Sequence, residues 1–481
     1  MSREEIRAVY AQGETAVIEL VESLLQRIQA LESRLDALEG KLSKDSKNSS
    51  KPPSGDGFGK RTQSLRGKSQ KSSGGQDGHP GQTLEWCEQA DEMIRHRVEH
   101  CAGCGLSLLE VPLEQVLSRQ VHDLPEIKIK VREHQIELKK CPDCGHDNAG
   151  EFPSGVNSVV QYGPRVKGLM VYLMHGQLLP SERTVELLRE LLGLEVSEGT
   201  LYNVGRQCYE ALEAVTQQIQ QLLLASPLIH FDETGLRVNG KLWWLHVACS
   251  AGLTHYFVHA KRGQAAMEAM EILPSYGGKA VHDGWASYAL YTACAHFLCN
   301  AHHLRELQFI LERYQQFWAF QMSLLLVTIY LEVETAKANK QTALSPEQLS
   351  AFETRYQAIL EEGRQANPPL TVPGATPKPR GRPKKSPAQN LLGRLSTQKQ
   401  SVLGFMYDFE VPFDNNQAER DIRMMKLKQK ISGSFRSSEG AQVFCRIRGY
   451  FSTLRKQGHS VVEALVALFS GQSIPLLAQP E

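Results

Sequence analysis

Three features of common protein classes are absent from this 481-residue sequence. No apolar run is long enough to span a bilayer, because the longest, from Trp318 to Leu331, is interrupted by Gln321 and Ser323. We expect a buried helix there and no membrane contact. The N-terminus lacks a secretory signal pattern, and the net charge of +1 does not by itself indicate a nucleic-acid-binding protein. The length allows two or three domains with an ample core.

Basic residues are unevenly distributed. Residues 41–71 contain nine Lys or Arg against two acidic residues, and residues 419–456 contain ten against three. Local basic patches are the electrostatic footprint of proteins that bind polyanions. The first patch is rich in Ser, Gly and Lys and cannot bury a core. Residues 44–85 are therefore predicted to be a disordered basic linker, which either touches a polyanion or serves as a solvated tether.

An apolar repeat precedes this linker. Its members are spaced alternately by four and three residues, which is the seam of a left-handed coiled coil, and a lone helix would leave that seam exposed. Residues 1–43 are therefore predicted to self-associate as a coiled coil. The repeat consists of Val17, Val21, Leu24, Ile28, Leu31, Leu35, Leu38 and Leu42.

Four of the ten cysteines form two Cys-x-x-Cys pairs, each followed by a glycine. Two thiolates at this spacing reach one ion, and four complete a tetrahedral zinc site. The alternating segment Ile127–Val131 predicts strands that bring the pairs together, so residues 86–155 are predicted to be a module with structural Zn²⁺. A redox dithiol is the alternative. Free cysteines without a signal peptide favour a reducing cytoplasm. The zinc ligands would be Cys101, Cys104, Cys141 and Cys144.

Residues 160–225 are predicted to be helical. One apolar helix ends at Gly193, and Ser197 opens the next. Two short helices joined by a glycine-containing turn can form a helix-turn-helix that binds DNA. A helical subdomain without DNA contact is the alternative.

From Pro227 the pattern changes to strands. The predicted order, β-β-β-α-β-α-β, is that of the ribonuclease-H-like fold, so the class is α/β over residues 226–455. Asp232 is expected at the end of the first strand and Asp283 at the end of the fourth, and these ends lie side by side in that topology. Glu233 is a competing ligand, but strand alternation directs it to the opposite face. The expected strands are 228–232, 242–249, 254–258, 279–283 and 296–299, and the expected helices are 264–273 and 285–293.

A third acidic residue shares a predicted helix with cations. Asp414 or Asn415 can cap this helix, after which Glu419, Arg423 and Lys426 fall on one helical face. A carboxylate beside cations suits a protein that holds a divalent metal ion and contacts phosphates. An ordinary solvated helix with an ion pair is the alternative.

Further helices are predicted around the acidic residues. A helical stretch of about residues 303–410 contains Pro379–Lys385, an Arg-Gly-Arg-Pro segment that either enters an A·T minor groove or forms a flexible basic loop. Residues 456–481 are predicted to form a C-terminal helix and tail. His282 and His302 are interpreted as core or hydrogen-bonding residues, with a phosphate-positioning role as the alternative.

Taken in order, the motifs resemble the transposases of the insertion-sequence-66 group, within the wider class of DDE transposases. The resemblance covers nearly the whole chain. It rests on the leucine-rich start, Lys-Asp-Ser-Lys-Asn-Ser-Ser-Lys-Pro-Pro-Ser, the Cys-x-x-Cys units, Asp-Glu-Thr, His-Asp-Gly-Trp and Asn-Asn-Gln-Ala-Glu-Arg. It implies that Asp232, Asp283 and Glu419 are a catalytic triad. It also implies a helical insertion between the last two, which are 136 positions apart.

The resemblance further implies a reaction and its partners. A DNA transposase of this class cleaves the 3′ ends of an insertion sequence and transfers them to target DNA, with two Mg²⁺, or Mn²⁺, ions on the triad. The partners would be the element's terminal repeats, the target, a second copy of the chain and accessory proteins, at the nucleoid in a bacterial cytoplasm. A silent DNA-binding regulator and a nuclease of the same fold are the alternatives. Backbone phosphates would be contacted by Arg420, Arg423 and Lys426.

Overall fold

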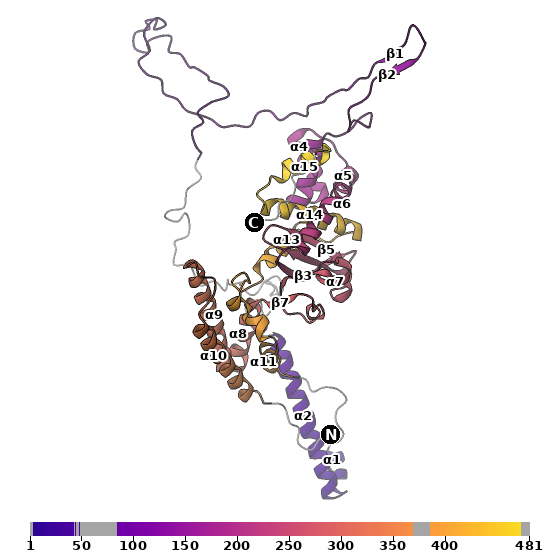
Figure 1. Ribbon diagram of the computed structural model, residues 1–481, viewed down its shortest axis with the longest axis vertical. Coiled ribbons are helices and arrows are strands. Elements are labelled where there is room, and N and C mark those ends of the chain that lie inside the picture. The colour runs from indigo at the N-terminus through magenta and orange to yellow at the C-terminus, as the bar shows by residue number, and fades with distance from the viewer. Residues whose placement is uncertain (1–2, 43, 45–47, 49–83, 369–384, 473–481) are drawn as a thin grey trace. The chain divides into compact units, whose positions relative to one another are not determined.

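The computed structural model describes residues 3–42, 44, 48, 84–368 and 385–472 (Figure 1). Most of the predicted linker, the Arg-Gly-Arg-Pro segment and the tail after residue 472 lie outside the described residues. The chain divides into two compact units, of which one comprises Ser64–Glu133 with Leu187–Glu195 and the other the rest of the chain. Each unit is described by itself.

The secondary structure follows in chain order. The helices are α1 (Arg3–Tyr10), α2 (Glu14–Leu42), α3 (Pro164–Val171), a π-helical turn (Tyr172–Gly176), α4 (Ser181–Leu192), α5 (Glu198–Ala211), α6 (Glu213–Leu224), α7 (Gln264–Met270), α8 (Asn300–Tyr314), α9 (Phe317–Ala338), α10 (Pro346–Ala366), α11 (Pro387–Thr397), α12 (Lys399–Tyr407), α13 (Asn416–Ser432), α14 (Ser438–Lys456) and α15 (Val461–Phe469). The strands are β1 (Leu138–Lys140), β2 (Asp147–Ala149), β3 (Leu228–Val238), β4 (Lys241–Cys249), β5 (Thr254–His259), β6 (Lys279–His282) and β7 (Ala295–Leu298).

The leucine repeat lies on α2, which is separated from α1 by a turn at Gly13 (φ +97°). Five side chains of the repeat are exposed, namely Val21, Leu24, Ile28, Leu31 and Leu35. An exposed apolar seam on a 29-residue helix is what a coiled-coil partner would cover.

The predicted strand at Ile127–Val131 is wrong: no strand is assigned to these described residues, and Ile127, Ile129 and Val131 are exposed. Alternation alone does not form a strand, because a strand also needs a neighbour for its backbone hydrogen bonds. The hairpin lies further along the chain, where β1 and β2 pair antiparallel on either side of the second cysteine pair.

The helical prediction for residues 160–225 is confirmed by α3 to α6. Ser197 caps α5 as expected, because its hydroxyl accepts a hydrogen bond from the backbone N–H of Thr200 at 3.1 Å. Gly193 after α4 has φ +60°, a conformation that glycine adopts at little cost.

A five-stranded mixed sheet has the order β5-β4-β3-β6-β7. The β3–β4 and β4–β5 pairs are antiparallel, whereas β3–β6 and β6–β7 are parallel. On one face of β3, Ile229 and Phe231 pack with α6 and α7. On the other, Leu236 and Val238 pack with α13 and α14, which Figure 1 shows beside the sheet. Alternate residues of β3 therefore belong to two separate cores.

Two predicted elements differ in extent. The first strand continues to Val238 instead of ending at Asp232, because β4 pairs with it along this whole length. The helix predicted at residues 285–293 is replaced by a loop with one 3₁₀ turn, Tyr288–Leu290. In that loop the backbone N–H of Trp285 donates to the nearby Asp283 side chain and the Tyr288 hydroxyl donates to Glu233, so one local and one tertiary hydrogen bond stand in place of helical ones.

The predicted helical insertion is formed by α8 to α12, of which α9, α10 and α11 lie side by side in Figure 1. One side of α9 packs in the core through Trp318, Met322 and Leu326. By length and composition alone, α9 is the one helix of the described residues that could cross a membrane. Its packed side is that of a core helix, which passes the same test.

Candidate active site

The strand register places Asp232 beside Asp283. Along the parallel pair, His230 of β3 is opposite Val281 of β6; Asp232 lies two residues further along β3, and Asp283 lies two residues after Val281, directly after the end of β6. At this point β6 ends and β3 continues with β4 alone. Both carboxylates therefore lie where two parallel strands separate.

Glu419 lies in the first turn of α13, which covers the same face of β3 as Asp232. Ala418, Ile422 and Met425 anchor this helix in the core beneath it. Asp421 holds the helix from its other side through an ion pair of 2.7 Å with Lys456 of α14, and both side chains are largely buried. The backbone thus brings the third carboxylate toward the sheet from 136 positions away in sequence.

The acidic residues raise the pKa of their neighbours. Burial raises the pKa of Asp232 well above its ordinary value, and the charges of Glu233, Asp283 and Glu419 raise it further. Burial and Glu233 also raise the pKa of Asp283. Such a cluster of carboxylate oxygens is what hard divalent cations such as Mg²⁺ bind, and a bound cation would relieve the mutual repulsion. The donor set therefore fits Mg²⁺ or Mn²⁺.

Glu233 lies on the opposite face of β3 and is fully occupied by protein partners. Arg262 donates to its Oε1 from Nε at 2.8 Å and from a terminal nitrogen at 2.6 Å, and the Tyr288 hydroxyl donates to its Oε2 at 2.6 Å. Its side chain is completely buried. With both oxygens bonded to protein groups, Glu233 is not available as a metal ligand.

Arg262 is a site residue that sequence reasoning missed. Its guanidinium lies between the indoles of Trp244 and Trp285, at 4.9 and 4.2 Å from their ring centroids. One of its nitrogens is also 3.9 Å from Oδ2 of Asp283, whose pKa it lowers. Arg262 therefore links the buried Glu233 to the loop that carries Asp283. Nothing in the local sequence signals this, because the contacts come from three separate strands and loops.

Asn415 is the second residue that was missed in this role. Either Asp414 or Asn415 was predicted as the helix cap; the Asn415 side chain makes no cap hydrogen bond, whereas Oδ1 of Asp414 accepts the N–H of Asn416. The buried Asn415 amide oxygen lies 2.8 Å from Nδ1 of His230, and its NH₂ donates to the Phe231 carbonyl at 2.8 Å. This residue therefore joins the start of α13 to the strand segment just before Asp232.

The start of α8 also faces Glu419. A guanidinium nitrogen of Arg305 lies 3.4 Å from Oε1 of Glu419, and Nδ1 of His302 lies 3.9 Å from the same oxygen. Burial, followed by the charges of Arg305 and Arg394, lowers the pKa of His302 to about 3. The imidazole is therefore neutral at physiological pH, and only Arg305 forms an ion pair with Glu419.

The three predicted phosphate contacts differ in accessibility. Arg420 and Arg423 are exposed on α13. Lys426 is half-buried, and its ammonium donates to the carbonyl of Gly235 in β3 at 3.0 Å. Burial lowers the pKa of Lys426. The first two cations are exposed to solvent, where a polyanion could reach them, whereas Lys426 connects α13 to the sheet.

Each cysteine pair folds into the same tight turn. Gly105 and Gly145 have φ +76° and +71°, and their N–H groups donate to the carbonyls of Cys101 and Cys141. In both turns, backbone N–H groups of the turn lower the pKa of the first thiol. The turns thus favour the thiolate, which is the form that binds zinc. The second members of the pairs are Cys104 and Cys144, both exposed.

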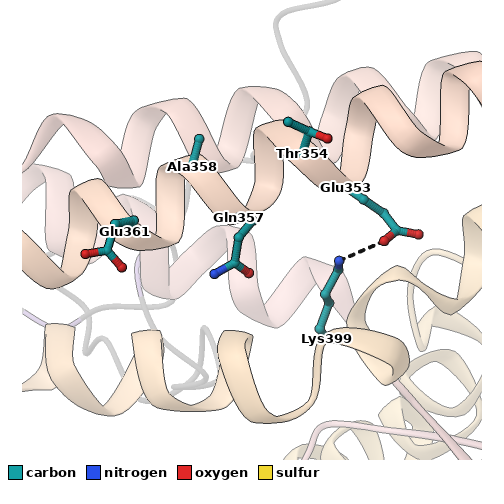
Figure 2. Close-up of a pocket in the computed structure, with 6 residues that line it drawn as sticks. All are labelled: Glu353, Thr354, Gln357, Ala358, Glu361 and Lys399. Carbon is teal, nitrogen blue, oxygen red and sulfur yellow. Dashed lines mark hydrogen bonds and ion pairs between the residues drawn. The ribbon is translucent and has the colours of Figure 1, made fainter.

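A shallow hollow of about 500 Å³ lies on the helical insertion (Figure 2). It is open to solvent, and Figure 2 shows Lys399 paired with Glu353 at one end. No member of the acidic triad lines it. The lining residues are Glu353, Thr354, Gln357, Ala358, Glu361 and Lys399.

Three family models match parts of the chain. A model described as the zinc-finger binding domain of transposase IS66 matches residues 99–145, which include all four paired cysteines, and supports a structural zinc ion. A family of unknown function matches residues 2–85, and a search of curated proteins found no match. The model described as Transposase IS66 family matches residues 159–443, more than half of the 481 residues, and includes Asp232, Asp283 and Glu419. The chain therefore belongs to the IS66 family of transposases.

Proposed function

We propose that the chain is a DDE transposase that cleaves the 3′ ends of an insertion sequence and joins them to target DNA. The observation that carries this proposal is the convergence of three carboxylates from separate elements. Asp232 lies in β3, Asp283 directly follows the neighbouring parallel strand β6, and Glu419 on α13 is near enough for its charge to raise the pKa of Asp232. Membership of the family supports a transposase role for this site.

The strand order supports a ribonuclease-H-like core for the reaction. Three antiparallel strands followed by two parallel ones, in the order β5-β4-β3-β6-β7, support this core, although a loop with one 3₁₀ turn replaces the second helix of the expected order. In this topology the first and fourth strands are neighbours, which explains why their acidic residues share a site. In chain order the insertion α8 to α12 lies between β7 and α13, so α13 follows it.

Asp232, Asp283 and Glu419 would hold two Mg²⁺, or Mn²⁺, ions, which supply Lewis-acid activation of water and stabilisation of the leaving 3′ oxygen. The chain's own part is to fix the carboxylates. The backbone N–H of Trp285 donates to Oδ1 of Asp283 at 2.9 Å, and the N–H of Glu233 donates to Oδ1 of Asp232 at 2.8 Å. These local bonds hold one oxygen of each carboxylate in place.

Two chemical steps would use this single site. In the first, water attacks phosphorus at each element end, the bond from phosphorus to the 3′ oxygen breaks, and a 3′-OH is released. In the second, that 3′-OH attacks a phosphodiester of the target, and the target strand's own 3′ oxygen leaves. Each step exchanges one P–O bond for another, so neither requires ATP. Exposed Arg420 and Arg423 would contact backbone phosphates, and Lys426 would hold α13 against β3.

The remaining regions would position DNA for these steps. The zinc module or the helices α3 to α6, with α4 and α5 as a helix-turn-helix, would recognise the terminal repeats. A coiled coil formed by α2 of two copies would pair the two ends. The linker and the Arg-Gly-Arg-Pro segment would add basic contacts. This work would take place at the nucleoid in a bacterial cytoplasm, with accessory proteins of the element.

A strand-transfer assay with pre-cut ends tests the proposal. The wild type should join ends to a target plasmid in Mg²⁺, whereas Asp232→Asn, Asp283→Asn and Glu419→Gln should bind ends without joining them. Binding without joining by the wild type, with accessory proteins supplied, would favour a silent regulator. Cutting without joining would favour a nuclease.

A further inference from the structure

Three potential metal ligands of different chemistry meet beside the acidic triad. One ligand atom each from Cys299, His302 and Glu419 lies within 4.8 Å of the other two. Cys299 is buried, and the other two are half-buried. A thiol, an imidazole and a carboxylate are the three side chains that bind Zn²⁺ in proteins, and three such ligands with one open position are typical of non-structural zinc sites.

The backbone holds these residues together without a metal. Cys299 immediately precedes α8, and the N–H of His302 in the first turn donates to its carbonyl at 3.1 Å, so the Cys-x-x-His spacing places both side chains at one helix end. The start of α8 is tied to the start of α13 twice. The N–H of Asn415 donates to Sγ of Cys299 at 3.2 Å, and the N–H of Asn300 donates to the Phe413 carbonyl at 3.0 Å.

The imidazole has an unused nitrogen that faces the other ligands. Nδ1 of His302 is buried and has no hydrogen-bond partner in the described part of the chain, although it lies 3.9 Å from Oε1 of Glu419. A buried polar atom without a partner costs free energy, about 1–3 kcal/mol in general. Such an atom is commonly explained by a ligand that is bound in the working state.

We propose that Cys299, His302 and Glu419 form a binding site for Zn²⁺, distinct from the cysteine-rich zinc module. Sulfur and nitrogen ligands favour this borderline ion over Mg²⁺, which prefers oxygen. On binding, the Cys299 thiol loses its proton to solvent, and the ion takes the place of the Arg305 guanidinium beside Glu419. Its consequence rests on the proposed function: zinc at this site would withdraw Glu419 from the magnesium site and so inhibit the magnesium-dependent reaction.

Titration with Co²⁺ tests the site directly, because a cobalt–thiolate bond gives a charge-transfer band in the near ultraviolet. The full chain, isolated with its zinc module loaded, is titrated as the wild type, Cys299→Ser and His302→Gln. Serine keeps an acceptor for the Asn415 N–H, so the backbone tie can survive. Cys87→Ser, which removes an exposed thiol elsewhere, is the matched control.

The wild type and Cys87→Ser should bind one Co²⁺ beyond the zinc module, with a band of one thiolate that Zn²⁺ abolishes. Cys299→Ser should lose the band, and His302→Gln should bind at least 10-fold more weakly, with both variants retaining the thermal unfolding profile of the wild type. An equal band and stoichiometry in Cys299→Ser, or the lack of any additional Co²⁺ in the wild type, would overturn the proposal. These readouts use no DNA, so they do not depend on whether the chain is a DDE enzyme.

Discussion

The two faces of β3 treat adjacent carboxylates in opposite ways. Glu233 faces α7, where Arg262 and Tyr288 occupy both of its oxygens. Asp232 faces α13, and burial together with the charges of Asp283 and Glu419 raises its pKa, with no cation among the causes. The comparison shows that the chemistry of an acidic residue is set by its partners. A carboxylate that is ion-paired with a cation stabilises the fold. A carboxylate beside other carboxylates is repelled by them, and a bound metal ion would offset this repulsion.

The largest expected effect is on the α13 face. Asp232→Asn should reduce joining of pre-cut ends in Mg²⁺ by at least about 10³-fold, because electrostatic stabilisation at the reacting phosphate is lost. The same variant should be more stable than the metal-free wild type at neutral pH, since it removes a carboxylate whose ionisation is opposed by burial and by its neighbours. Gel-based joining and thermal unfolding measure the two effects. A less stable Asp232→Asn protein would contradict this view of the site.

The pH dependence of stability should also reveal the carboxylate on the α13 face. The pKa of Asp232 is raised in the folded chain, so between its ordinary value near 4 and the raised value the folded state binds more protons than the unfolded state. The metal-free wild type should therefore lose stability as the pH rises through this range. Asp232→Asn should lack this contribution. Denaturant unfolding at several pH values measures it, and parallel curves for the two proteins would count against the raised pKa.

The α7 face should respond mainly in stability. Glu233→Gln should cost about 2 kcal/mol in the free energy of unfolding, because charge-assisted hydrogen bonds from the partly exposed Arg262 are lost. Joining should fall by about 10- to 100-fold, as for groups that position metal ligands. Tyr288→Phe, which removes one bond and leaves the charge pair, is the milder control. A loss of joining as complete as in Asp232→Asn would mean that Glu233 is itself a ligand.

A smaller effect should appear in the pH profile of Arg262→Gln. Arg262 lowers the pKa of Asp283, so without it the carboxylate takes up a proton at higher pH. The acid limb of magnesium-dependent joining should therefore move to higher pH. Arg446→Gln is the matched control, since Arg446 also stacks on an aromatic ring, that of Tyr209. An unmoved acid limb in Arg262→Gln would remove Arg262 from its positioning role.

The smallest effects are expected when the cations of α13 are replaced. Arg420→Ala and Arg423→Ala should weaken DNA binding at all sequences and each reduce the slope of log affinity against log salt by about 1. Lys426→Ala should instead lower stability, because its ammonium donates to the Gly235 carbonyl. Fluorescence anisotropy over a salt series separates these outcomes. A reduced salt slope for Lys426→Ala at unchanged stability would place it among the phosphate contacts.

The sequence alone predicted the five strands of the sheet and their order along the chain, although the first strand runs past Asp232 to Val238. Apolar runs set the strands, and the strand order then made Asp232 and Asp283 neighbours without any knowledge of side-chain contacts. The capped start of α5 at Ser197 was equally readable, because capping depends on residues within one turn.

Partners far apart in the chain could not be predicted. Asn415 was predicted, as the alternative to Asp414, to cap α13, but its side chain contacts His230, 185 positions away. The loop after Asp283 has a helical pattern, yet Tyr288 is drawn to Glu233, 55 positions earlier. Local preference decides an element only where no stronger tertiary bond competes. Cys299 and Glu419 are likewise brought together by tertiary hydrogen bonds between residues far apart in the chain.

The most direct test uses an element end in which sulfur replaces the 3′ bridging oxygen of the scissile phosphate. If ions on Asp232, Asp283 and Glu419 stabilise the leaving 3′ atom, the wild type should cut this DNA poorly in Mg²⁺, which binds sulfur weakly, and far better in Mn²⁺. Unmodified DNA should show no such preference. Equal cleavage of the sulfur-containing DNA in both metals, or rescue by Mn²⁺ that persists in Asp232→Asn, would contradict a metal-dependent site built on this triad.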